Sequence, residues 1–214
     1  MAALFPPWSN TAFRIAVGAI LLGGASALAA PMIYVRSPWS TRQSVPLVQP
    51  VEFDHRHHNQ DDAIDCRYCH NTVDRSATAG MPSTGKCMGC HSQIWNDSTK
   101  LEPVRASWFS GLPIRWKRVH NLPDFVYFNH AIHVNKGVGC VTCHGRVDQM
   151  PAVMQVAPLT MQWCLECHRA PEQHLRPLDA ITDMNWLPAH AGEGAAIAEE
   201  LGVRRLTNCT SCHR

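Results

Sequence analysis

The pentapeptide Cys-x-x-Cys-His occurs five times in this 214-residue chain, and no cysteine lies outside it. On one helical turn the two thiols stand at positions i and i+3 and the imidazole at i+4, so the three side chains share a face. This pattern is the attachment signature of c-type haem, in which the cysteines bind the porphyrin edge and the histidine ligates the iron. The sequence therefore predicts five covalently bound haem c groups.

Each motif supplies two thioether cysteines and one proximal iron ligand. The predicted thioether residues are Cys66, Cys69, Cys87, Cys90, Cys140, Cys143, Cys164, Cys167, Cys209 and Cys212. The predicted proximal ligands are His70, His91, His144, His168 and His213. Zinc sites and structural disulfides also use paired cysteines, but neither requires a histidine directly after every second cysteine.

Composition favours a chain organised by its cofactors. The formal net charge is +2 before haem, and each haem adds two propionates, so nothing favours nucleic acid as a partner. Fifteen prolines and thirteen glycines interrupt the chain, and no sheet or helical bundle is evident. We expect a mainly irregular fold with short α-helices, a multihaem cytochrome c organised around stacked haems, with one N-terminal transmembrane helix. Without haem the chain should be largely unfolded.

The apolar run from Ile15 to Val35 contains 21 residues without a charge, which is long enough to cross a bilayer as a helix. The small residues Ala27 and Ala29 would also suit a cleavable signal, but the run is longer than a typical signal core. We therefore expect a retained anchor. Haem is attached to such motifs on the outer face of the cytoplasmic membrane, so we expect a single-pass protein whose haem domain is periplasmic or extracytoplasmic.

An internal repeat organises the rest of the chain. Residues 51–58 and 126–133 both read V-x-F-[DN]-H-x-x-H, and two haem motifs follow each copy. The predicted segments are a cytoplasmic N-terminus (1–14), a transmembrane helix (15–35), a linker (36–50), dihaem unit 1 (51–100), a connector (101–123), dihaem unit 2 (124–170) and a C-terminal extension with the fifth haem (171–214).

Eight histidines lie outside the motifs, and five distal ligands would complete the coordination of five irons. The predicted distal ligands are His55, His58, His130 and His133, which form the two H-x-x-H pairs, and His120. His57 is more typical of a solvated or supporting residue. The alternatives for the fifth ligand are His174, His190 and a methionine among Met150, Met154, Met161 and Met184.

The chain resembles the pentahaem subunit of alternative complex III. The resemblance rests on the single span, the five motifs, the paired F-x-H-x-x-H units and two sequence segments, VHNLPDFVYFNHAIHV and PLTMQWCLECHRAPE. The haem units also resemble class III cytochromes, in which the first histidine of such a pair binds the haem of its own unit. That resemblance implies His55 for haem one and His130 for haem three, and leaves His58 and His133 unassigned.

The resemblance implies an electron-relay subunit of a quinol-oxidising membrane complex, which passes electrons toward a periplasmic or extracytoplasmic acceptor and is not catalytic on its own. The implied partners are an iron-sulfur subunit, polytopic quinol-binding membrane subunits, membrane lipid, and a monohaem cytochrome c or another soluble carrier. The alternatives are a small membrane-anchored multihaem quinol dehydrogenase and a multihaem reductase with an open-coordination haem, which would bind CO.

Overall fold

The computed structural model describes residues 5–213. The chain divides into two compact units between Gln43 and Ser44, a point inside the predicted linker 36–50. Residues 1–4, which begin the predicted cytoplasmic N-terminus, and residue 214 lie outside the described residues.

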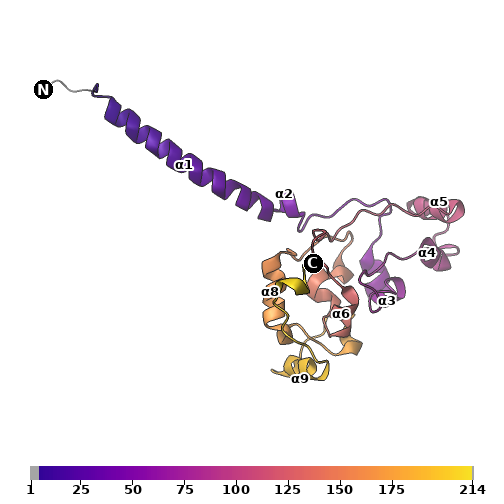
Figure 1. Ribbon diagram of the computed structural model, residues 1–214. Coiled ribbons are helices and arrows are strands. Elements are labelled where there is room, and N and C mark those ends of the chain that lie inside the picture. Colours follow the sequence, from indigo (N-terminus) through magenta and orange to yellow (C-terminus); the bar gives the residue numbers. More distant parts are fainter. Residues whose placement is uncertain (1–4, 214) are drawn as a thin grey trace. The chain divides into compact units, whose positions relative to one another are not determined.

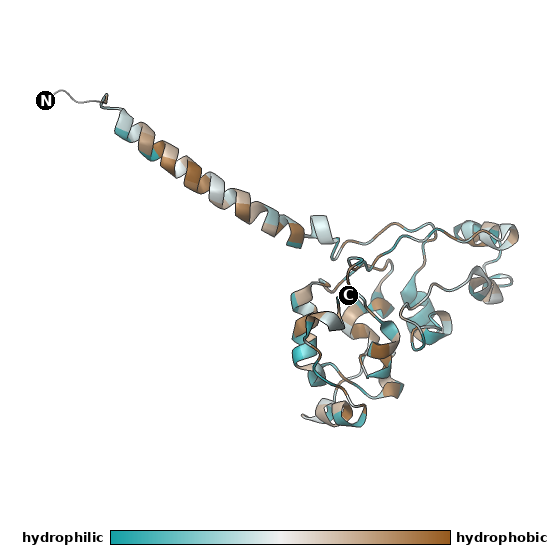
Figure 2. Cartoon of the chain, in the orientation of Figure 1, coloured by the Kyte–Doolittle hydropathy of each residue, from teal (hydrophilic) through white to brown (hydrophobic). Residues whose placement is uncertain are grey.

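The first unit consists of helix α1 (Ser9–Arg36) and the single turn α2 (Pro38–Thr41) (Figure 1). Helix α1 has 28 residues, which corresponds to a length of ~42 Å. It continues through Pro31 and ends at Arg36, because the next residue, Ser37, is extended, and the position before a proline, here Pro38, disfavours the helical conformation. None of its residues is buried, and apolar residues cover much of its length (Figure 2). By length and composition alone, α1 could cross a membrane.

The second unit is built from helices of one to three turns. The α-helices are α3 (Cys66–Cys69), α4 (Thr84–His91), α5 (Glu102–Ser110), α6 (His130–Asn135), α7 (Cys140–His144), α8 (Met161–Arg169) and α9 (Glu193–Glu200). The unit also contains one π-helical segment, η1 (Arg56–Asp61). Its 3-10 turns are η2 (Thr99–Leu101), η3 (Val147–Gln149), η4 (Pro171–Gln173), η5 (Leu178–Ala180) and η6 (Cys209–Ser211). In the described residues β-structure occurs as isolated bridges, such as that between Val138 and Leu175. The predicted fold class, mainly irregular with short helices, is confirmed.

Side-chain caps begin several of these short helices at the functional residues. The side chain of Asp65 accepts a hydrogen bond from the main-chain N–H of Arg67 and so starts α3 one residue before Cys66. Asn129 caps α6 directly before His130, and Thr160 caps α8. Such caps satisfy main-chain N–H groups that the first turn of a helix leaves free. The local sequence thus fixes where each helical motif begins.

Helix α5 lies within the segment that the sequence predicted as a connector. Pro103 occupies its first turn and Gly111 follows its last residue in the left-handed conformation, which is the usual placement of these two residues at helix ends. The helix packs against α4 (Figure 1). The connector is therefore partly helical and packs against the second haem motif.

Few apolar side chains are buried in the second unit. The buried apolar residues among those described are Val51, Val104, Met150, Ala157, Leu175, Ile181 and Ile197. No large side chain there is fully buried. A protein interior of this size does not stabilise a unit of this length by itself. The fold therefore fits a chain in which large apolar cofactors supply much of the interior.

Candidate haem-binding sites

Each Cys-x-x-Cys-His motif lies on or at the end of a short helix. The first four belong to α3, α4, α7 and α8, and the fifth begins with the 3-10 turn η6. All ten cysteines are free of disulfide bonds. In the described residues no three His, Cys, Asp or Glu side chains converge as a bare metal ion would require. The helical turns instead present pairs of thiols and one imidazole, which is the donor set of c-type haem.

Main-chain carbonyl groups orient the predicted proximal imidazoles. Three of them place Nδ1 within hydrogen-bond distance of a carbonyl oxygen: His70 with Gly80 at 3.0 Å, His91 with Ile94 at 3.0 Å, and His213 with Phe125 at 3.1 Å. A carbonyl oxygen only accepts, so Nδ1 carries the proton. Nε2 therefore keeps a free lone pair for iron, with its ring held in place.

Three of the five predicted distal histidines show the same arrangement. The Nδ1 atoms of His58 and His133 lie 3.0 Å and 2.7 Å from the carbonyl oxygens four residues earlier, at Asp54 and Asn129. His130 Nδ1 lies 3.3 Å from the carbonyl oxygen of Ala77. These contacts again leave Nε2 free.

Three predicted proximal histidines each lie opposite a predicted distal histidine; of these pairings the sequence predicted only His130 with His144. Their ring centroids are separated by 6.0 Å for His58 and His91, 6.0 Å for His133 and His168, and 6.2 Å for His130 and His144. Metal–imidazole bonds of about 2 Å on each side of one ion would place the two centroids roughly 6 Å apart. The spacing therefore fits an iron between the two rings of each pair.

His55 is the predicted partner of His70. Burial, followed by the neighbouring His70 and His58, lowers the pKa of His55 to about 4. Its Nδ1 is buried without a hydrogen-bond partner in the protein. A neutral, half-buried imidazole whose buried Nδ1 has no protein partner fits a residue whose partner is not a protein atom.

The sequence repeat is also a geometric repeat. Phe53 stands edge-on to His55 with ring centroids 4.7 Å apart, and Phe128 stands edge-on to His130 with centroids 4.8 Å apart. The same phenylalanine contacts both histidines of its pair. Each aromatic ring thus sets the relative direction of two histidines that face different motifs.

His120 lies against the third motif. Its Nε2 is 3.2 Å from Nδ1 of His144, and the two rings are nearly perpendicular with centroids 4.4 Å apart. Burial, followed by His120 and His130, lowers the pKa of His144 to about 3, so its imidazole is neutral. No ring contact joins His120 to His213 in the described part of the chain. The prediction that His120 ligates the fifth iron stays a prediction.

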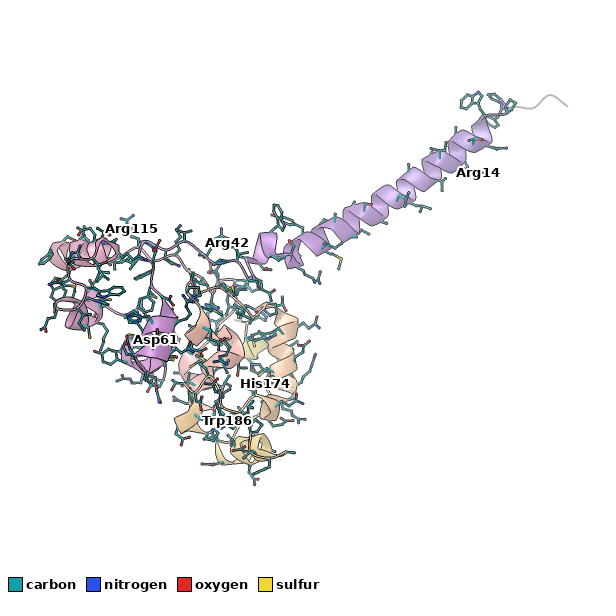
Figure 3. The ribbon with its side chains drawn as sticks, turned by 180° about the vertical axis from the view of Figure 1, so that it is seen from behind. Arg14, Arg42, Asp61, Arg115, His174 and Trp186 are labelled. Atoms are coloured by element: carbon teal, nitrogen blue, oxygen red, sulfur yellow. The ribbon has the colours of Figure 1, made fainter. Side chains whose placement is uncertain are left out.

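The remaining candidates differ in their surroundings. His57 is exposed and lies 3.5 Å from Asp61 and 3.6 Å from Asp62, which suits the supporting role expected of it. His190 is exposed, and the half-buried His174 follows η4 (Figure 3). Among the methionine alternatives, Met150 is buried and Met161 is exposed.

The first and second motifs are neighbours in space. Lys86, next to Cys87 of the second motif, places Nζ 4.3 Å from the ring centre of Tyr68 in the first. Burial raises the pKa of the Cys69 thiol, and the nearby Cys90 contributes to the increase. The two motifs therefore present their cysteines toward a common region.

The first motif also adjoins the third. The Cys66 and Cys140 thiols are close enough to affect each other: Cys140 raises the pKa of Cys66, and Cys66 lowers that of Cys140. The main-chain N–H of His130 donates to the carbonyl oxygen of Ala77, seven residues after the first motif, at 3.2 Å. Dihaem unit 2 therefore packs against the segment that follows the first motif, at Ala77.

The third, fourth and fifth motifs continue this series. Burial, followed by Cys167 and Cys164, raises the pKa of Cys143 to about 12. Burial and the nearby Cys212 raise the pKa of Cys164. The first motif thus has both the second and the third motif as neighbours, and the thiols of the third and fourth motifs, and of the fourth and fifth, are near enough to affect one another's pKa. This series, second, first, third, fourth and fifth, differs from the order of the motifs in the sequence.

Two family models match separate parts of the chain. Residues 32–108 match the class III cytochrome c family, and residues 126–214 match cytochrome c7 and related cytochrome c. Together with the fold and the paired histidines, these matches indicate an arrangement typical of multihaem cytochromes c. More narrowly, these two parts of the chain are similar to multihaem cytochromes of the class III and c7 type, families whose members carry covalently bound haem c.

A curated relative comes from Nitratidesulfovibrio vulgaris (strain Hildenborough), where it is described as "Menaquinone reductase, multiheme cytochrome c subunit". It is 27% identical over 175 residues, which cover 78% of this chain and 77% of the relative. The similarity therefore extends over most of both chains.

Proposed function

We propose that this multihaem cytochrome c is a membrane-anchored electron-relay subunit of a quinone-linked respiratory complex. The observation that carries the proposal is the set of histidine pairs whose rings face each other at 6.0–6.2 Å. A second imidazole opposite the first occupies the position at which a substrate would have to bind iron. Such a site suits electron transfer and disfavours catalysis at the metal.

Five haem c groups would be held by the five motifs. The distal ligands would be His55 opposite His70, His58 opposite His91, His130 opposite His144, and His133 opposite His168. The fifth distal ligand, opposite His213, is predicted from the sequence alone. These pairings agree with the class III resemblance for His55 and His130, and they give His58 and His133 to the second motif of each repeat.

When bound, haem c supplies reversible one-electron transfer at its iron. The residues of the chain keep the structural rearrangement that accompanies this electron transfer small. In the pair His58 and His91 both imidazoles are held by a hydrogen bond at Nδ1, so neither ligand has to move or dissociate when the charge of the iron changes. Burial lowers the pKa of His144 and His55, which keeps these imidazoles neutral so that their lone pairs stay available.

The continuous series of neighbouring motifs supports a relay with two ends, the second motif beside α5 and the fifth near the C-terminus. Electrons would pass between these ends along the order second, first, third, fourth and fifth. The proposed segments keep their predicted bounds: 1–14 inside the cell, 15–35 in the membrane, and 36–214 on the periplasmic or extracytoplasmic side.

The proposed role has two possible directions of electron flow. The resemblance to alternative complex III favours quinol oxidation, with an iron-sulfur subunit and polytopic membrane subunits as partners and a monohaem cytochrome or soluble carrier as the acceptor. The name of the curated relative, a menaquinone reductase subunit, favours electron flow toward the quinone. We favour quinol oxidation because the resemblance includes the span, all five motifs and both paired units.

One experiment tests the relay, and another tests its direction. Low-temperature electron paramagnetic resonance of the oxidised protein, with CO added to the reduced protein, should show only low-spin haems that do not bind CO. A high-spin haem that binds CO would instead support a reductase.

For direction, the isolated complex is mixed with menaquinol or with a reduced soluble cytochrome, and haem absorbance is followed. Rapid haem reduction by quinol, with slow reduction of quinone by the cytochrome, is the expected result; the reverse would favour the reductase direction.

A further inference from the structure

The hydrogen-bond partner of His144 differs in kind from those of the other proximal histidines that have such a contact. His70, His91 and His213 each direct Nδ1 to a main-chain carbonyl oxygen. His144 instead directs Nδ1 to Nε2 of another imidazole, that of His120, at 3.2 Å. The third motif therefore has a side-chain acceptor, which a substitution can remove.

The proton positions in this pair follow from the chemistry. A histidine that ligates iron through Nε2 carries its proton on Nδ1, so His144 donates and His120 Nε2 accepts. The proton of neutral His120 must then lie on its own Nδ1. One nitrogen of His120 thus accepts from His144 and the other holds a proton, which leaves His120 without a lone pair for another iron.

We infer that His120 is a positioning residue for the third haem site, where it accepts a hydrogen bond from the proximal ligand His144 and thereby lowers the reduction potential of that haem. The inference rests on the proposed function, in which His144 ligates an iron. It replaces the role of His120 as the fifth distal ligand, because the same nitrogen cannot serve both.

The effect on potential has a direct physical cause. Donation from Nδ1–H to a basic nitrogen increases electron density on the imidazole and strengthens its bond to ferric iron. The oxidised state is stabilised more than the reduced state, so the reduction potential falls. The third motif lies in the middle of the series of neighbouring motifs. A change in the reduction potential of its haem would therefore affect the passage of electrons in both directions.

The test compares three variants of the full-length protein. His120→Leu removes the acceptor, His120→Gln keeps an acceptor of similar reach, and His57→Leu removes an exposed histidine that contacts Asp61 and Asp62. Each variant is examined by electron paramagnetic resonance, by CO addition and by a redox titration that resolves the individual haems.

The expected result is specific to one haem. In His120→Leu all haems should stay low-spin and unreactive with CO, while the reduction potential of one haem rises. His120→Gln should show a smaller rise, and His57→Leu none. A new high-spin haem that binds CO, in either His120 variant, would show that His120 ligates an iron and overturn the inference. Unchanged potentials in His120→Leu would also overturn it.

Two features keep the test decisive. If His120→Leu fails to assemble, His120→Gln still separates the two roles, because a glutamine does not replace a histidine as a strong iron ligand. Failure of the proposed function would appear in the unsubstituted protein as a haem that binds CO. Failure of the inference appears only in the variants.

Discussion

Phe128 stacks on His133 with ring centroids 4.5 Å apart and an angle of 29° between the planes. Phe53 stacks on His58 in the same way, at 4.4 Å and 22°. An aromatic contact of this kind stabilises a ring orientation by about 0.5–1.5 kcal/mol. Together with the carbonyl contact at Nδ1, it orients each of these histidines toward the second haem motif of its repeat.

Replacement of His133 by alanine should leave a single iron without its distal ligand. In the His133→Ala protein all haems should remain covalently attached, because the thioether cysteines are unchanged, but one haem should become high-spin and bind CO. Absorbance and CO difference spectra would measure this. The matched control is His57→Ala, which removes an exposed histidine next to His58 and should leave the spectrum unchanged. A fully low-spin His133→Ala spectrum would contradict the assignment of His133.

The angles between facing rings predict two kinds of low-spin signal. The planes meet at 70° for His58 and His91 and at 79° for His133 and His168, but at 11° for His130 and His144. Crossed axial planes leave the two iron d orbitals that interact with the ligands close in energy, whereas parallel planes separate them. Electron paramagnetic resonance should therefore show two strongly anisotropic haems and at least one rhombic haem. A spectrum that contains only rhombic signals would be inconsistent with the observed ring angles.

A substitution at Gly139 should destabilise the third motif through Arg176. A Cβ atom at Gly139 would overlap the Arg176 guanidinium, which is 6% exposed and donates to the Asp183 carbonyl oxygen at 2.7 Å. Gly139→Ala should lower the free energy of unfolding by roughly 1–3 kcal/mol, as overpacking does, measured by thermal unfolding of the haem-loaded protein. Gly89→Ala is the matched control inside another motif, since a Cβ there meets no atom within 4 Å. The Gly89→Ala protein should keep its free energy of unfolding or gain slightly, because alanine favours a helix more than glycine does. An equal loss of unfolding free energy in both variants would refute the overlap with Arg176.

The chain without haem should not fold its second unit. Of the described residues in that unit, only the seven buried apolar ones named above are available as a protein core, and short isolated helices are unstable in water. When the full chain is produced without haem attachment and kept in detergent, circular dichroism should show helix equivalent to α1 alone. Helix content equal to that of the haem-loaded protein would show that the second unit folds without its cofactors.

The sequence was sufficient for the features that depend on local spacing. The five motifs lie on short helical turns, the fold class is confirmed, and the repeat around Phe53 and Phe128 has the same geometry in both copies. The two H-x-x-H pairs differ locally, since the first enters a π-helical segment and the second begins α6. A spacing of three residues brings both histidines near the same phenylalanine in either case.

The features that sequence reasoning missed depend on contacts between distant segments. The second and third motifs are consecutive in the sequence, yet the first motif adjoins both of them. Spacing within the chain contains no information on that order. His120 lies next to His144, 24 residues away, and no local pattern indicates a hydrogen bond between them. Helix α5 could have been predicted, because Pro103 and Gly111 stand at its two ends.

The small protein interior has a consequence for how such a chain evolves. Ordinary domains keep a large set of apolar residues because each one packs against many others, and a change at one site disturbs its neighbours. Here the attachment motifs, the facing histidines and a few caps carry most of the structural constraint, and the surrounding residues can be exchanged with little loss. A chain of this kind can therefore change far in sequence while its architecture persists.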